Sequence, residues 1–126
     1  MKGNSPLFKN TSSSLLFKLN LQLFASKNIS DTGIKLQNSV HNIKLRNLIG
    51  ELYRNGATVG DGSAMAAASE QVKTGVLIKD RDHIKKIEER IKNINNIMKS
   101  QNLDSNDIKY AKKLLKDMER SLKGEY

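Results

Sequence analysis

The chain has 126 residues, no cysteine and a formal net charge of +9 at pH 7. This length fits one small domain, and a chain without cysteine forms neither disulfides nor thiolate metal sites. No apolar run approaches the roughly 18 residues that a membrane-spanning helix needs.

The excess positive charge is concentrated in the first half of the chain. Residues 1–58 hold eight Lys or Arg against two Asp or Glu, whereas residues 59–126 hold fourteen against eleven. A basic arm joined to a nearly balanced body suits a polyanion such as RNA, DNA or an anionic lipid surface. An arm that is merely solvated and disordered would have the same composition.

The first 27 residues are basic and rich in serine, as in targeting peptides. Lys18, Asn20 and Gln22 interrupt their apolar core, so we expect no secretory signal. Apolar and polar residues alternate over Phe17–Leu23, which favours a strand-like arm that joins another chain's sheet or stays loose. The polar residues from Ser26 to about Asn38 indicate a linker. We therefore divide the chain into an arm with linker, 1–38, and a helical domain, 39–126.

Two helices are predicted in the middle of the chain. The first runs from about Val40 to Asn55, with an apolar stripe on one face, and Asn55-Gly56 ends it. The second begins at Asp61 or Ser63, either of which can cap it, and runs to Thr74-Gly75.

The C-terminal half carries the most regular pattern. After a cap at Asp80 or Asp82, five apolar residues recur at spacings of three and four: Ile84, Ile87, Ile91, Ile94 and Met98. A second set follows the polar loop 100–107: Ile108, Ala111, Leu115, Met118 and Leu122. Matching stripes joined by a short loop predict an antiparallel helical hairpin. The fold class is therefore mostly α, a small helical domain with a C-terminal hairpin and a loose or strand-like N-terminal arm.

Three glycines lie close together in "GATVGDGS", Gly56–Ser63. A phosphate-binding loop of the nucleotide-binding type ends in Gly-Lys, and Asp61-Gly62 stand there instead, so a nucleotide loop is excluded. One interpretation is a tight turn between two helices, whose glycines are scaffold. The other is an anion pocket at the start of the second helix. Its candidate binding residues are Gly60, Asp61, Gly62, Ser63 and Lys73.

Two segments resemble known proteins. "LNLQLFA", Leu19–Ala25, resembles a segment that opens small prophage-encoded proteins of Gram-positive bacteria, among them capsid-associated proteins and toxin modules. The segment Glu51–Ile97 resembles a C-terminal helical module of polymorphic-toxin-type proteins, and the similarity extends over about Val40–Leu122. The matched positions are Leu52, Tyr53, Arg54, Gly56, Ala57, Gly60, Asp61, Gly62, Thr74, Gly75, His83 and Lys86.

The chain departs from that module at two points. Met65–Ala68 stand where the module has a more polar helix start that usually carries an aspartate. Lys79 and Asp80 replace a Gly-Gly before the histidine. If the missing aspartate is catalytic in the module, this chain lacks that activity.

A metal-free ribonuclease needs a base that titrates near neutral pH and a cation for the charge on the phosphorane. His83, Lys86 one helical turn later, and Arg54 from the glycine joint form such a candidate catalytic set. Alternatively, His83 is an ordinary exposed residue in the first turn of a charged helix. His41 and His83 lie far apart without a spaced carboxylate pair, so we expect no metal site and no cofactor.

The leading hypothesis is a prophage-linked, polymorphic-toxin-type module that acts on or binds nucleic acid, as a metal-independent ribonuclease if it is an enzyme. The alternative is a non-enzymatic helical accessory or structural protein of a phage particle or toxin complex. The sequence leaves open whether the chain is an enzyme. The expected partners are nucleic acid and an immunity protein or phage structural protein, and the expected location is the cytoplasm or a phage particle.

Overall fold

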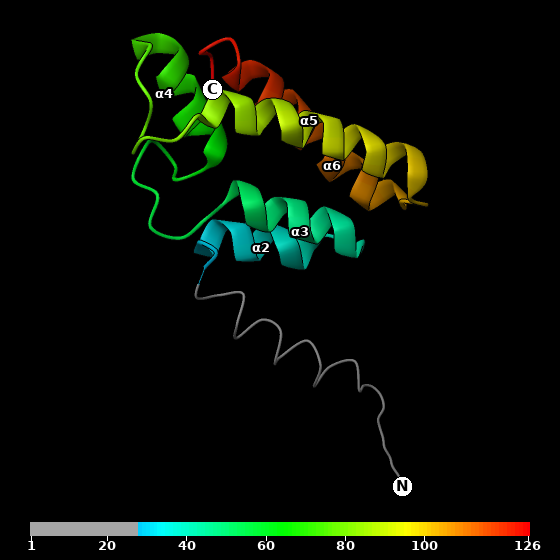
Figure 1. Cartoon of the computed structure of the whole chain (residues 1–126). Coiled ribbons are helices and arrows are strands. Elements are labelled where there is room, and N and C mark those ends of the chain that lie inside the picture. The colour runs from blue at the N-terminus through cyan, green and yellow to red at the C-terminus, as the bar shows by residue number, and fades with distance from the viewer. Residues whose placement is uncertain (1–27) are drawn as a thin grey trace, which may run out of the picture.

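The computed structural model describes residues 28–126, which form five helices (Figure 1). The strand-like arm predicted for Phe17–Leu23 lies outside these residues. Within 28–126, β pairing is limited to two isolated bridges, so the predicted mostly α fold is confirmed. The helices are α2 Asp31–Ser39, α3 Ile43–Leu52, α4 Ala64–Thr74, α5 His83–Ser100 and α6 Ser105–Ser121.

Helix α2 corrects the linker predicted for residues 26–38. The side chain of Ser30 caps the helix by accepting a hydrogen bond from the Gly33 N–H at 3.2 Å. Gly33 does not end the helix; it allows α2 to pack closely against the end of α3. A Cβ at this position would lie 2.6 Å from the Cβ of Tyr53. The sequence does not indicate this helix, because the residues of α2 are mostly polar and form only a weak apolar face.

Helices α3 and α4 were predicted from the sequence, but α3 is shorter at both ends than the predicted range from about Val40 to Asn55, since it begins at Ile43. Helix α3 ends at Leu52, so Asn55-Gly56 does not cap it; Gly56 instead has a φ of 85° in the following loop. Helix α4 follows the prediction, since Ser63 caps its start and Gly75, with a φ of 72°, caps its end.

The predicted C-terminal hairpin is confirmed, and one residue of the stripe predicted for its second helix, Ile108, is corrected. Asp82 caps α5, and Ile87 and Ile94 are fully buried. On α6 the buried face passes through Ala111, Leu114 and Met118 rather than through Ile108, which is 37% exposed. The buried position one turn before Ala111 belongs to an aspartate, Asp107.

Helix α4 lies across the end of the α5–α6 hairpin and also touches α3 (Figure 1). Its alanines leave room for close packing, and Met65 and Ala68 are completely buried. The loops at both ends of α4 are thereby held against α3 and α5. No helix within residues 28–126 is both long and apolar enough to cross a membrane.

The glycine joint between α3 and α4 has the conformation that only glycine adopts without strain. Gly56, Gly60 and Gly62 all have positive φ. A Cβ on Gly60 would also lie 2.8 Å from the Cβ of Ala66, whereas one on Gly56 would meet nothing within 4 Å. The joint is therefore a tight turn packed on the first turn of α4.

We expect Gly60→Ala to lower the free energy of unfolding by about 2 kcal/mol and Gly56→Ala by about 1 kcal/mol. Both variants carry the cost of positive φ, and only the first adds the clash with Ala66. Urea denaturation measures the difference. Equal losses in the two variants would show that the loop does not pack on α4 as described.

Candidate functional site

A cavity of about 500 Å³ lies where the glycine joint meets the starts of α4 and α5. We call it the basic cavity, because its ionisable lining residues are all basic: Arg54, Lys79, Arg81, His83 and Lys86. Among the residues that the structure describes, no Asp or Glu lines it. The start of α4, at Ser63 and Ala64, adds the partial positive charge of a helix N-terminus. The cavity is therefore suited to an anion.

The structure brings together the three candidate catalytic residues, Arg54, His83 and Lys86, on the walls of the basic cavity. Two of the five candidate binding residues, Gly62 and Ser63, lie there as well. The other three, Gly60, Asp61 and Lys73, do not line it. Lys73 is exposed in the last turn of α4, at the far end of the helix from the cavity.

Asp61 is exposed and does not line the cavity, and its carboxylate is hydrogen-bonded within the protein. One carboxylate oxygen accepts hydrogen bonds from the Ser63 N–H at 3.0 Å and the Ser63 hydroxyl at 2.6 Å. The other accepts the Tyr126 hydroxyl at 2.5 Å. Burial opposes ionisation of Asp61, but these hydrogen bonds outweigh it and lower its pKa. Asp61 therefore ties the glycine joint to the C-terminal residue and holds Ser63 for capping.

His83 is held in place by neighbouring polar groups. Its backbone N–H donates to the side-chain oxygen of Gln71 at 2.7 Å, and the amide of Gln71 donates to Asp82 at 3.0 Å. Its Nδ1 lies 3.2 Å from the carbonyl oxygen of Arg81. Because a carbonyl only accepts, Nδ1 carries the hydrogen, and Nε2 of the neutral ring is left as the proton acceptor.

The pKa values of His83 and Lys86 are both lowered. Burial is the largest cause for His83, and the charges of Lys86 and Arg81 add to it. Burial is also the largest cause for Lys86, followed by the charges of Arg90 and Arg54. His83 is therefore mainly neutral at pH 7, while half-buried Lys86 gives up its proton more readily than an ordinary lysine.

Arg81 and Lys79 are cavity residues that the sequence analysis missed. Lys79 and Asp80 have φ values of 52° and 60°, and the Arg81 N–H donates to the Ile78 carbonyl at 3.0 Å across a tight turn. The turn reverses the chain direction, and Arg81 lines the cavity together with His83. Aspartate tolerates this region of positive φ, but neither residue is glycine or asparagine, so the turn signal in the sequence was weak.

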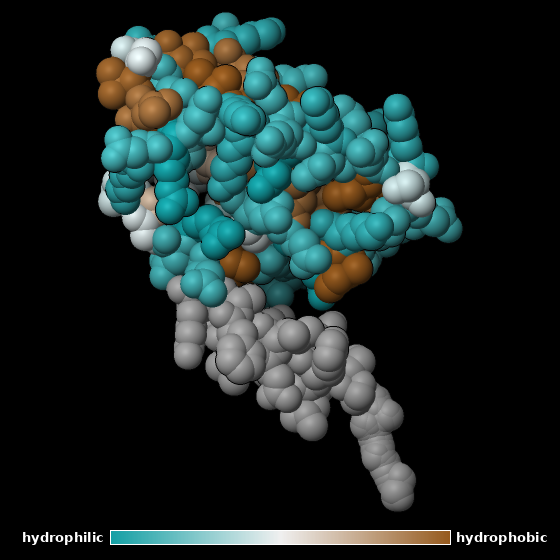
Figure 2. All heavy atoms as spheres, in the orientation of Figure 1, coloured by the Kyte–Doolittle hydropathy of each residue, from teal (hydrophilic) through white to brown (hydrophobic). Residues whose placement is uncertain are grey.

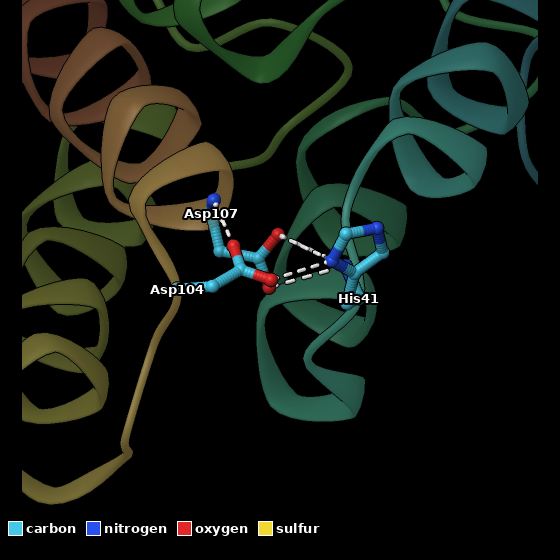
Figure 3. Close-up of side chains that lie close together, drawn as sticks. All are labelled: His41, Asp104 and Asp107. Atoms are coloured by element: carbon cyan, nitrogen blue, oxygen red, sulfur yellow. Dashed lines mark hydrogen bonds and ion pairs between the residues drawn. The ribbon is translucent and has the colours of Figure 1, made fainter.

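A second cluster joins the start of α3 to the start of α6 (Figure 3). His41 Nδ1 lies 2.6 Å from the carboxylate of Asp104, which caps α6. Buried Asp107 accepts the backbone N–H groups of His41 at 3.0 Å and Asn42 at 2.8 Å. We call these residues the His41 clamp. No local sequence pattern marks the clamp, because His41 lies more than 60 positions from both aspartates.

Ligand atoms of His41, Asp104 and Asp107 lie within 4.8 Å of one another, a spacing that a metal ion could span. However, both oxygens of Asp107 already accept backbone N–H groups, and one also accepts the side-chain amide of Asn106 at 3.1 Å. A cation would have to compete with these donors. We therefore assign the clamp a structural role, docking the start of α3 on α6.

The His41 clamp makes stability depend on pH. The hydrogen bond and charge of Asp104 raise the pKa of His41 in the folded chain. The stability that His41 contributes is therefore fully present below pH 6.5 and is lost as the pH rises through the raised pKa. The backbone N–H of Asp107, and then His41, lower the pKa of Asp104, whose contribution is present above 3.8 and lost on acidification.

We expect His41→Gln to destabilise the chain more at pH 5.5 than at pH 8.5. Thermal unfolding across this range measures the difference from the parent. His83→Gln is a control of opposite sign, because the lowered pKa of His83 makes its protonation below pH 6.5 unfavourable to folding. A His41 effect that does not change with pH would contradict the ion pair.

No known protein family, curated protein or solved structure matches this chain. The chemistry of the basic cavity therefore carries the functional conclusion.

Proposed function

We propose that the chain is a prophage-linked, polymorphic-toxin-type module that binds RNA in the basic cavity and cleaves it without a metal ion. The observation that carries the proposal is the convergence of His83, Lys86, Arg54 and Arg81 on one cavity. A neutral histidine among fixed cations is the set that attack on a phosphodiester requires. The net charge of +9 supports a polyanionic substrate.

In the proposed reaction, Nε2 of His83 takes the proton of a ribose 2′-hydroxyl. The 2′ oxygen bonds to phosphorus, and the bond from phosphorus to the 5′ oxygen breaks. The Lys86 ammonium donates a proton to that leaving oxygen, and Arg54 and Arg81 stabilise the charge on the phosphorane. The products are a 2′,3′-cyclic phosphate and a 5′-hydroxyl, and proton exchange with water restores both side chains.

Three observations support the metal-free chemistry and the origin. The described lining of the basic cavity offers no carboxylate to hold a divalent cation. The segment Glu51–Ile97 resembles the polymorphic-toxin module named above. Where that module has Gly-Gly, Lys79 and Asp80 both adopt positive φ, the region that glycine favours.

We expect the double variant Arg54→Gln, Lys86→Gln to bind single-stranded RNA more weakly and with less dependence on salt. Each lost phosphate contact should make the plot of log K against log salt less steep by about 0.7, the value for single strands. Fluorescence anisotropy at several salt concentrations measures it. Lys112→Gln, an exposed residue of α6 outside the cavity lining, is the matched control.

The same titration distinguishes the proposed function from the alternative, a non-enzymatic accessory protein. If the parent chain binds no RNA, or if the double variant and the Lys112→Gln control behave alike, the basic cavity is not a phosphate site. In that case the accessory role, with a phage structural protein as partner, becomes the better hypothesis. Loss of growth on induction of the parent, relieved in the double variant, would agree with a toxin.

A further inference from the structure

A groove of about 310 Å³ runs between α3 and α5, separate from the basic cavity. Two nearly buried apolar residues lie at its base, Leu48 and Ile97, which are 3% and 8% exposed. The other lining residues are polar or charged: Lys44, Asn47, Glu51, Asn93, Asn96 and Ser100. Three asparagines, Asn47, Asn93 and Asn96, stand on its rim and are exposed. Figure 2 shows that the molecular face drawn there is largely hydrophilic, with hydrophobic side chains appearing between polar ones.

The asparagine amides of this groove are available to a ligand. Within residues 28–126, the side chains of Asn47, Asn93 and Asn96 make no hydrogen bond to the protein; the Ser100 hydroxyl donates to the backbone carbonyl of Asn96 at 2.7 Å, not to its side chain. Each amide presents a donor and an acceptor side by side. This pairing matches the edge of adenine, which offers an adjacent donor and acceptor to asparagine.

One face of α5 joins the groove to the basic cavity. Lys86 lines the cavity and Asn93 lines the groove, and they lie seven residues apart, about two helical turns or 10 Å. Arg90 lies on the same face between them and forms an ion pair with Glu51 of α3, with 2.9 Å between Nε and the carboxylate. A strand whose phosphate lies in the cavity can therefore place a neighbouring base in the groove.

We propose that the groove between α3 and α5 is a nucleobase subsite, which holds an adenine of single-stranded RNA against Leu48 and Ile97 and reads its edge with the asparagine amides. Unpaired bases are recognised in this way, by contact with the base face and hydrogen bonds to its edge. The inference rests on the proposed function, because the groove acts on a strand that the basic cavity holds.

The test uses free adenosine and inorganic phosphate as separate probes of the full-length, ¹⁵N-labelled chain. Adenosine should shift the side-chain amide resonances of Asn47, Asn93 and Asn96, whereas phosphate should shift resonances around Arg54 and Lys86. Because adenosine has no phosphate, its result does not depend on the basic cavity. Adenosine that leaves the three amide resonances unchanged would overturn the subsite, whereas failure of phosphate and RNA to bind would overturn the proposed function instead.

A double variant tests whether the asparagine side chains bind the base. Asn93→Ala with Asn96→Ala should weaken adenosine binding about tenfold and remove the preference of the chain for A-rich over U-rich RNA. Its phosphate binding and thermal stability should remain those of the parent, because both side chains are exposed. Asn102→Ala, an exposed asparagine outside the groove lining, is the control. Equal affinity of the parent for A-rich and U-rich RNA would also overturn the assignment.

Discussion

His83→Gln is expected to lower the rate of RNA cleavage by about 10²- to 10⁴-fold, the usual contribution of a general base. Glutamine keeps much of the volume of the ring, and the hydrogen bond from the His83 backbone to Gln71 does not need the side chain. RNA affinity should change little, because Arg54, Arg81 and Lys86 remain in the basic cavity. Cleavage of a labelled oligonucleotide, followed over time, measures the rate.

The matched control is His41→Gln, the same substitution at the other histidine. It weakens the His41 clamp but leaves the basic cavity intact, so the cleavage rate at 25 °C should be that of the parent. A His83→Gln variant that cleaves RNA at the parental rate would remove the base from the mechanism. Equal losses of cleavage rate in both histidine variants would show that the losses come from reduced stability and not from removal of a general base.

Under the proposed mechanism, the parent chain should show a bell-shaped dependence of the cleavage rate on pH. The acid limb falls below 6.5, because the pKa of His83 is lowered by burial and by its cationic neighbours. The alkaline limb lies below 10.5, because the pKa of Lys86 is also lowered and its ammonium is needed as the acid. A rate that stays constant as pH falls through the acid limb would contradict His83 as the base.

Asp107→Ala should produce the largest loss of stability, about 3 kcal/mol in the free energy of unfolding. The carboxylate is 1% exposed and accepts the backbone N–H groups of both His41 and Asn42. Removing it leaves these donors without a partner at the start of α3 and opens a space beside α6. Urea denaturation measures the loss, provided that the dependence of the unfolding free energy on urea concentration is the same in parent and variant.

Two neighbours serve as controls for this position. Ile108→Ala changes an exposed side chain next to Asp107 and should cost less than about 0.5 kcal/mol if its exposure is the deciding factor. Asp107→Asn keeps an oxygen acceptor but places an amide against N–H donors, so we expect an intermediate loss. If Asp107→Ala and Ile108→Ala cost the same, the clamp does not hold α3 on α6.

Local signals predicted most of the fold. The cap at Ser63, the glycine at 75 and the apolar spacing of α5 act over a few residues, so the sequence shows them directly. Helix α2 escaped prediction because its stability comes from packing of Gly33 on Tyr53, which is a tertiary contact. In the stripe predicted for α6 only Ile108 failed, because Asp107 occupies the buried position at the α3 contact; Ala111, Leu115, Met118 and Leu122 pack on the core as predicted.

The candidate site was predictable only in part. His83 and Lys86 lie one helical turn apart, so their proximity follows from the sequence, and Arg54 was added from the resemblance and the glycine joint. The contribution of Arg81 depends on the positive φ values of Lys79 and Asp80, which a lysine-aspartate pair does not indicate. The His41 clamp and the asparagine groove both join distant helices, and no local pattern marks either.

The most direct test of the proposed function is to incubate the purified chain with single-stranded RNA in excess EDTA and identify the ends of the products by mass spectrometry. We predict fragments with 2′,3′-cyclic phosphate and 5′-hydroxyl ends, formed by the parent and not by His83→Gln. RNA that stays intact with the parent chain, or fragments that appear only when a divalent metal is supplied, would contradict a metal-independent ribonuclease in the basic cavity.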